Sequence, residues 1–167
     1  MELKKYFLEQ LETEAASARK VLERVPEGRN TWKPHERSME LGYLASLVAA
    51  IPGWIGTMIE NDVTDLNDPA GSLRSRAAST RQELLALLDQ GLTKSRQALK
   101  STTEDHLLES WRLKMGERVI TDGPRYQQIR DGAFGHLAHH RGQLTVYLRL
   151  NEAKVPAIYG PSADEWH

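Results

Sequence analysis

Residues 41–59 read LGYLASLVAAIPGWIGTMI, a run of 19 positions without a charged side chain. This length is close to that of a membrane-spanning helix, which needs about 20 apolar residues. Against a span, Pro52 and three glycines interrupt the run, and Glu60 follows it with no cluster of lysine and arginine to orient a helix in a bilayer. We therefore expect these residues to form the most buried helix of a soluble helical bundle.

The chain as a whole has an ordinary globular composition. Of its 167 residues 40% are hydrophobic and 27% are charged, and the formal net charge is −1. This length suits one domain, so we assign residues 1–167 to a single domain. A near-neutral charge argues against a nucleic-acid-binding protein. The chain has no cysteine, which excludes thiolate metal ligands and fits a reducing compartment. With no secretory signal in the first residues, we expect a cytoplasmic protein.

Apolar residues recur at helical spacing in three further segments. Residues 3–25 form one such segment, which ends at a Pro-Glu-Gly sequence. Residues 73–99 carry a leucine stripe, although Thr80, with Glu83 three positions later, offers a later start as a capping box. The last helix begins near Asp122-Gly123-Pro124 and continues to about residue 151.

The connections between these helices are expected to be irregular. Ser38 is a plausible N-cap for the uncharged helix, and Pro52 should kink that helix or end its first half. Residues 65–72 contain an Asn-Asp-Pro sequence and a glycine, which predicts a turn. Residues 101–122 are the least regular part of the chain, and within them residues 111–120 alternate around Gly116, which indicates a short β-hairpin or an extended loop. Residues 157–167 form an irregular tail. The predicted fold is all-α: a four-helix bundle with a hairpin or irregular segment before the last helix and an irregular C-terminal tail.

Three of the six histidines lie in the last predicted helix. His136 and His140 are four positions apart, so their rings share one helical face and are placed to bind one metal ion. A pairing of His136 with His139 is the second option. Leu137 replaces the glutamate of the HExxH motif, which disfavours a zincin-type peptidase. The alternative is that the pair is structural, with satisfied hydrogen bonds. The other histidines lie in or near loops and are expected to be solvated: His35, His106 and His167.

Other polar and aromatic residues have simpler interpretations. Arg141, Arg149 and Gln143 resemble an anion site, but we expect them to cover the outer face of the helix or to contact the tail. The four tryptophans are scattered along the chain, which is typical of core or interface residues: Trp32, Trp54, Trp111 and Trp166.

Three segments of the chain resemble the DinB/YfiT-like family. Residues 136–149, HLAHHRGQLTVYLR, resemble the last helix of these proteins, and residues 155–165, VPAIYGPSADE, resemble their tail. Residues 38–45, SMELGYLA, resemble the start of their second helix. The resemblance implies a four-helix bundle that is commonly a dimer, with a divalent metal held by three histidines. The family name reflects DNA-damage-inducible expression of some members, and some relatives use the metal to activate a low-molecular-weight thiol or are grouped with hydrolases.

This chain departs from the metal site that the resemblance implies. Two of the family's ligands correspond to His136 and His140, but the third falls at Leu47, which cannot bind a metal. Two imidazoles alone make a weak site. Our leading hypothesis is an altered site for a divalent metal such as zinc or nickel, acting on a small-molecule or thiol substrate. The alternative is a non-enzymatic homodimer with structural histidines that binds a small apolar ligand or none. Whether the protein is an enzyme stays open, and neither hypothesis involves nucleic acid or a membrane.

Overall fold

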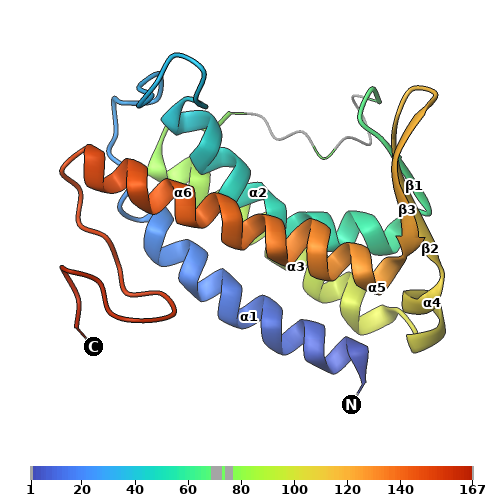
Figure 1. The fold of residues 1–167 in the computed structure, drawn as a ribbon. Helices are drawn as coiled ribbons and strands as arrows, with labels where there is room; N and C mark the ends of the chain where they lie inside the picture. The colour runs from blue at the N-terminus through green and yellow to red at the C-terminus, as the bar shows by residue number, and fades with distance from the viewer. Residues whose placement is uncertain (1, 69–72, 74–76, 167) are drawn as a thin grey trace.

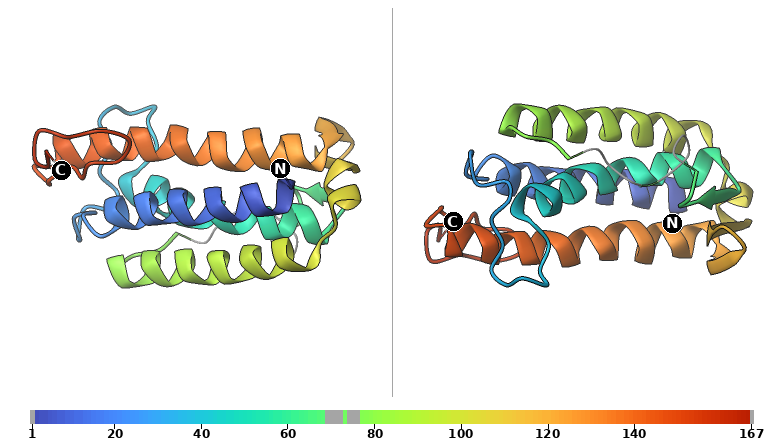
Figure 2. Two further views of the ribbon diagram at one scale, coloured as in Figure 1. Left: turned by 90° about the horizontal axis from the view of Figure 1, so that it is seen from below. Right: turned by 90° about the horizontal axis from the view of Figure 1, so that it is seen from above.

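The computed structural model describes residues 2–68, 73 and 77–166 and shows four long helical segments (Figure 1). The first three are α1 (Leu3–Leu22), α2 (Leu41–Glu60) and α3 (Arg81–Ser101). In the fourth, α5 (Arg125–Gln128), the π-helix η1 (Ile129–Gly135) and α6 (His136–Leu150) follow one another without a break. The segments lie side by side in both views of Figure 2, and their apolar faces meet in one core. The prediction of a mainly helical protein is confirmed.

Helix α2 is the central element of this core. It is long and apolar enough to span a membrane by length and composition, but 67% of its most apolar window is buried inside the protein. Burial on several sides explains why the helix has no polar face: it packs against α1, α3 and the fourth helical segment. This arrangement is that of a core helix, as its sequence predicts.

Pro52 lies inside α2 without ending it. Proline lacks an N–H group and normally disturbs the hydrogen bonds of the preceding turn. Here the Ser95 hydroxyl of α3 donates to the Pro52 carbonyl at 2.7 Å and accepts from the Gly56 N–H at 2.9 Å, so it bridges two groups that an α-helix would pair directly. Beside it the two helices touch at their backbones, since a Cβ on Gly53 would lie 2.9 Å from the Gly91 Cα.

Several predicted helix boundaries need correction. Helix α3 starts at Arg81 with the capping box of Thr80 and Glu83, so the start at Leu73 is wrong and the later alternative is confirmed. Leu73 is buried but not helical. Helix α1 stops at Leu22, three residues before the predicted end. The N-cap of α2 is Glu40 rather than Ser38, and it makes no side-chain capping bond. Of the turn predicted at residues 65–72, positions 69–72 lie outside the described residues.

A small sheet closes one end of the bundle, which corrects the all-α prediction. Its strands are β1 (Val63–Asp65), β2 (Ser110–Met115) and β3 (Arg118–Pro124), with a short helix, α4 (Glu104–Leu108), before β2. The β2–β3 hairpin, which turns at Gly116 with φ of +60°, was one of the two predicted alternatives. Strand β1 pairs in parallel with β2 and was not predicted, because three residues carry no recognisable alternation and their partner is distant in sequence.

Arg125 joins this sheet end to the helices. Its side chain is fully buried, and its guanidinium donates to the carbonyl of Met58 at 2.6 Å and to that of His106 at 2.8 Å. It also forms an ion pair with Asp62 at 2.6 Å. A buried guanidinium is stable only when its hydrogen-bond donors are satisfied, so Arg125 fixes the ends of α2 and α4 beside the start of the fourth helical segment.

The irregular C-terminal tail is tied back onto the helices. Asp164 accepts a hydrogen bond from the backbone N–H of Val155 at 2.8 Å and forms an ion pair with Arg149 of α6. Glu165 pairs in the same way with Arg24 after α1 and accepts from the Ala157 N–H at 2.9 Å. The tail folds back over these helices at the end remote from the sheet (Figure 1).

Candidate functional site

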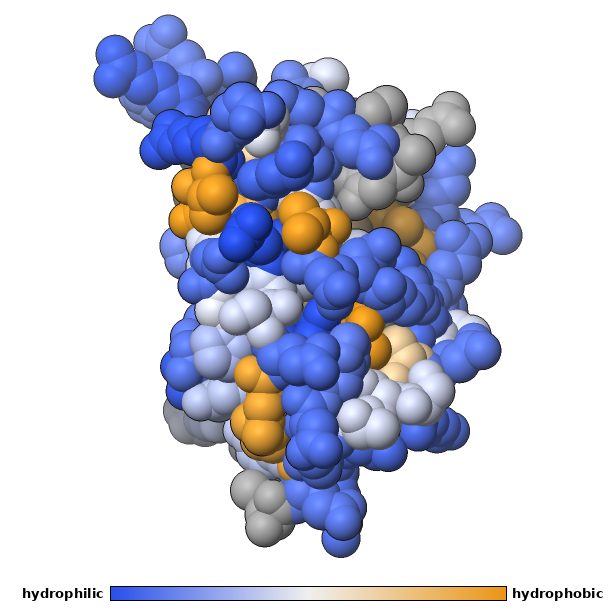
Figure 3. All heavy atoms as spheres, turned by 90° about the vertical axis from the view of Figure 1, so that its right-hand side faces the viewer, coloured by the Kyte–Doolittle hydropathy of each residue, from blue (hydrophilic) through white to orange (hydrophobic). Residues whose placement is uncertain are grey.

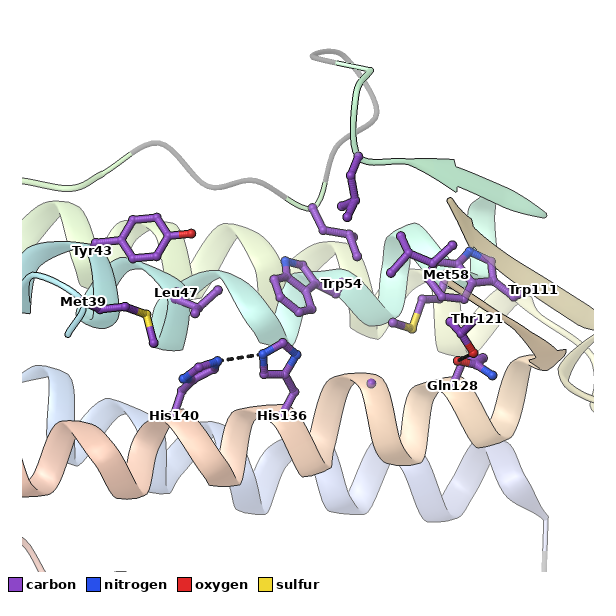
Figure 4. Close-up of a pocket in the computed structure, with 14 residues that line it drawn as sticks. Met39, Tyr43, Leu47, Trp54, Met58, Trp111, Thr121, Gln128, His136 and His140 are labelled. Carbon is purple, nitrogen blue, oxygen red and sulfur yellow. Dashed lines mark hydrogen bonds between the residues drawn. The ribbon is translucent and has the colours of Figure 1, made fainter. Parts of the chain in front are cut away.

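A pocket of about 450 Å³ lies between α2 and the fourth helical segment, with the sheet at one end. Its volume is in the range of small-molecule sites in proteins, roughly 300–1,000 Å³. Figure 4 shows that side chains from α2 and from the fourth helical segment face each other across it. The described residues that line it are Met39, Tyr43, Leu47, Trp54, Met58, Leu66, Leu73, Trp111, Leu113, Thr121, Gln128, Gly132, His136 and His140.

The α2 side of the pocket is apolar. Tyr43, Leu47, Trp54 and Met58 follow one another at helical spacing along α2, and Met39 precedes the helix on the same side. Tyr43 is 51% exposed, which places it at the mouth of the pocket. This side therefore offers aromatic rings, thioethers and one leucine to a bound molecule.

The opposite side carries polar groups at regular intervals. Gln128, Gly132, His136 and His140 are spaced four residues apart and all line the pocket. In a regular α-helix each such step turns about 40°, so Gln128 would lie about 120° away from His140 around the axis. The wider turn of the π-helix η1 offsets this drift. A single face of the fourth helical segment thus reaches from the sheet end to the histidine pair.

The two predicted histidines meet in the pocket, as their spacing predicts. Their Nε2 atoms lie 2.7 Å apart, and the dashed line in Figure 4 marks this contact. The Nδ1 atom of His140 contacts the side-chain oxygen of Gln143 at 2.7 Å, and Trp54 packs edge-on against His136 with ring centroids 5.2 Å apart. His136 is therefore held by a residue of α2, and His140 by a residue of its own helix.

The pocket keeps both imidazoles in their neutral form at pH 7. Burial lowers the pKa of His136 below its usual value of about 6.5, and the neighbouring His140 lowers it further. Burial is also the main cause that lowers the pKa of His140, while its hydrogen bond to Gln143 acts in the opposite direction. Neutral imidazoles offer both a donor and an acceptor nitrogen.

The residues of the pocket supply only part of a metal site. Tetrahedral zinc with bonds of about 2.0–2.1 Å would place two ligand nitrogens about 3.3 Å apart, so the rings of His136 and His140 would have to separate slightly. Leu47 lies across from them on α2 (Figure 4). Among the described residues no group of three histidine, aspartate or glutamate side chains is placed to hold an ion. The side chains therefore fall short of the three-ligand set that the family resemblance implies.

The other histidines lie away from the pocket. His139 is exposed and touches it only indirectly, through its ring contact with His140. His35 is exposed as predicted, whereas the prediction for His106 is wrong: its Nε2 lies 2.9 Å from the Ile59 carbonyl oxygen, and its ring is half-buried. His167 lies outside the described residues.

The arginines of α6 contact the tail, as expected, rather than forming an anion site. Arg149 binds Asp164, and Arg141 binds the Tyr159 hydroxyl, although Arg141 is buried rather than on the outer face. Gln143 instead hydrogen-bonds His140 of the histidine pair.

Most pocket residues carried no functional signal in the sequence. Trp54 and Trp111 were predicted only as core or interface residues, and Thr121 and Gln128 were not singled out. The π-helix that aligns Gln128 with the histidines has no sequence motif of its own. The i, i+4 histidine pair was the one signal that pointed to this face.

Comparison with known proteins agrees with the mainly helical fold. The model of the DinB family matches residues 1–167. The uncharacterized protein YrdA of Bacillus subtilis (strain 168) is 31% identical, over 96% of this chain and 90% of its own. Among solved structures, a DinB-like protein from Bacillus cereus ATCC 10987 superposes with a TM-score of 0.68 at 20% identity, over 92% of this chain and 95% of its own. The DinB-like protein YjoA of Bacillus subtilis superposes with a TM-score of 0.68 at 16% identity, over 97% of this chain and 99% of its own. The chain belongs to the DinB family.

Proposed function

We propose that the protein binds a small, largely apolar and uncharged organic molecule in the pocket between α2 and the fourth helical segment. The observation that carries this proposal is the lining: a cavity of about 450 Å³ whose described lining residues include no lysine, arginine, aspartate or glutamate. A charged ligand would lose its hydration there without gaining a counter-ion. An apolar ligand gains by displacing water from the aromatic and aliphatic side chains of α2.

His136 and His140 supply the polar contact in this proposal. Their pKa values are lowered by burial, so the pair is neutral. A hydroxyl, a thiol or a carbonyl group of the ligand can hydrogen-bond an imidazole in place of the contact between the two Nε2 atoms. Apolar pockets with a few convergent polar groups are typical ligand sites. The ligand would thus lie along α2 with one polar group at the histidines.

Titration with butylbenzene, an uncharged apolar probe, tests the pocket directly. Binding should give a saturable change in fluorescence, because Trp54 and Trp111 line the cavity. Gly132→Leu should abolish binding: a Cβ at Gly132 meets only the Met58 methyl, at 3.5 Å, so the rest of the leucine side chain enters the pocket. Gly142→Leu is the matched control, since a Cβ there meets nothing within 4 Å and Gly142 does not line the pocket.

The absence of saturable binding to the wild type would contradict the proposal. Equal binding by Gly132→Leu and the wild type would show that the probe binds elsewhere on the surface.

A divalent ion at His136 and His140 is the second candidate, and the facing Nε2 atoms favour it. Thiol-transfer or hydrolytic activity of the kind implied by the family resemblance rests on this candidate. Calorimetric titration with zinc and nickel should show binding to the wild type that His136→Ala removes, because one imidazole cannot retain an ion against water. Leu47→His should raise the affinity by adding a third imidazole.

If neither the wild type nor Leu47→His binds more tightly than about 1 μM, the metal hypothesis fails. In that case Leu47→His should only lower stability, because it puts a polar ring into an apolar wall.

A further inference from the structure

Polar groups gather at the sheet end of the pocket, away from the histidine pair. Thr64 pairs with Leu113 across β1 and β2, and Leu113 pairs with Thr121 across β2 and β3. Paired residues point to the same face of a sheet, so these three side chains form one row. Trp111, two positions before Leu113, shares that face. Leu113, Thr121 and Trp111 line the pocket, so the row belongs to its inner end.

Two polar atoms on this face have no partner among the described residues. The indole Nε1 of Trp111 and the hydroxyl oxygen of Thr64 are both buried and make no hydrogen bond. Most buried polar groups in native proteins are hydrogen-bonded, so an unpaired indole N–H beside a cavity calls for an acceptor. Indole can only donate. The missing partner of Trp111 is therefore an acceptor.

Gln128 adds a second donor at the same place. Its side-chain oxygen accepts from the Thr121 hydroxyl at 3.1 Å, which leaves the amide nitrogen as its remaining polar group. Gly123 on β3 leaves room for that nitrogen, because a Cβ there would lie only 3.2 Å from it. The π-helix η1 begins at the next residue and brings Gln128 onto the face that carries the histidines.

We propose that the sheet end of the pocket is a second polar subsite, in which Gln128 binds a neutral hydrogen-bond acceptor of the ligand, such as a carbonyl oxygen. This rests on the proposed function of the pocket as a small-molecule site. The acceptor is neutral because no charged side chain among the described lining residues balances an anion. Gln128 precedes His136 by eight residues, which is about two turns of the fourth helical segment. The ligand class is an elongated molecule with an apolar middle and a carbonyl-type group at the sheet end.

Two probes that differ only in a carbonyl test the subsite: 4-phenylbutan-2-one and butylbenzene. Both are titrated into the wild type, Gln128→Met and Gln127→Met, with tryptophan fluorescence as the readout. Gln128→Met should weaken ketone binding about fivefold to tenfold, the effect of one neutral hydrogen bond, and change butylbenzene binding less than about twofold. Gln127→Met is the matched control: its amide contacts the Tyr126 hydroxyl and does not line the pocket. Thr121→Val removes the hydroxyl that holds the Gln128 amide in place. It should therefore also weaken binding of the ketone and leave binding of butylbenzene unchanged.

The outcomes separate the two proposals. If both probes bind the wild type and Gln128→Met weakens them equally or not at all, the subsite is refuted while the pocket stands. An equal effect of Gln127→Met on the ketone also refutes the subsite. If neither probe binds the wild type, the proposed function fails and the subsite fails with it.

Discussion

At the scale of single residues, Arg141 and Glu14 form an ion pair between α6 and α1 that water hardly reaches. The Nη1–Oε2 distance is 2.6 Å, and the two side chains are 1% and 5% exposed. The Tyr159 hydroxyl of the tail donates to the same carboxylate at 2.9 Å, and its ring lies against the Arg141 guanidinium. Although the residue as a whole is 72% exposed, desolvation of its hydroxyl, together with this bond to Glu14, raises the pKa of Tyr159, so the hydroxyl keeps its proton as a donor.

Breaking this pair should be costly. Arg141→Met leaves the Glu14 carboxylate buried without its cation, and we expect the free energy of unfolding to fall by about 3–5 kcal/mol in urea denaturation. Arg149→Met removes the more exposed pair with Asp164 and should cost no more than about 1 kcal/mol. Replacing Glu14 by leucine in the Arg141→Met background should recover most of the loss. Equal effects of the two arginine substitutions would contradict the buried pair.

Residues of the site could be predicted from the sequence where helix geometry alone places them, but not where non-local pairing or an irregular helix does. His136 and His140 share a face by helix geometry alone, so their spacing was sufficient. Leu47 was placed opposite them only through the family resemblance. Gln128 and Trp111 reach the pocket through the π-helix and the strand pairing, neither of which leaves a local periodic signal.

At the scale of elements, Gly91 shows how a feature that weakens a predicted helix can serve packing. Glycine is about 1 kcal/mol worse than alanine inside a helix, so Gly91 weakens the helical pattern of residues 73–99. In the structure a Cβ on Gly91 would lie 3.0 Å from the backbone of Gly53. The residue is required where α2 and α3 cross, a contact that no periodicity of α3 alone reveals.

Two glycine-to-alanine substitutions should therefore have opposite effects. Gly91→Ala should lower the free energy of unfolding by about 1–3 kcal/mol, because backbone on both helices must move apart. Gly142→Ala on α6 should raise it by about 0.5–1 kcal/mol, since a Cβ there meets nothing within 4 Å and the helix gains propensity. Urea denaturation of both variants measures the difference, and a stabilising Gly91→Ala would show that the two helices are not in backbone contact.

The tail should detach on acidification before the helices unfold. The Arg149 side chain lowers the pKa of Asp164, and Arg24 does the same for Glu165. A carboxyl group whose pKa is lowered by folding contributes stability above its unfolded value of about 4, and that contribution is lost as pH falls through the folded pKa. The amides of Val155 and Ala157, which donate to these carboxylates, should lose hydrogen-exchange protection below about pH 4. Asp164→Asn should expose the Val155 amide already at pH 7; unchanged protection there would contradict the tail contacts.

At the scale of the whole molecule, the helical architecture follows from the sequence because each long helix carries its own apolar pattern. The three-stranded sheet cannot be predicted from local sequence patterns, because β1 is a strand only through its pairing with β2, which is distant in the sequence. The uncharged run at residues 41–59 is longer than one packed helix face needs, and this apolar surplus predicts a homodimer. The structure accounts for much of that surplus within one chain, where α2 is enclosed by the other helices and by the pocket.

The predicted homodimer must therefore use apolar side chains that remain on the surface. At the sheet end, shown in Figure 3, hydrophobic side chains lie in separate groups among hydrophilic ones. On α6, Val146 and Leu150 are 56% and 53% exposed and lie one turn apart. A helix face of this kind permits close packing against a second copy.

We expect sedimentation velocity at micromolar concentration to show a dimer of the 18.9 kDa chain that Val146→Lys converts to monomer. The lysine places a charge in the apolar contact and another at the symmetry-related position, and like charges there repel. Val119→Lys on β3 is the control, because that side chain is equally exposed, at 50%, but lies on the sheet. A wild type that sediments as a monomer at every concentration would refute the dimer, and a dimer that survives Val146→Lys but not Val119→Lys would move the interface to the sheet end.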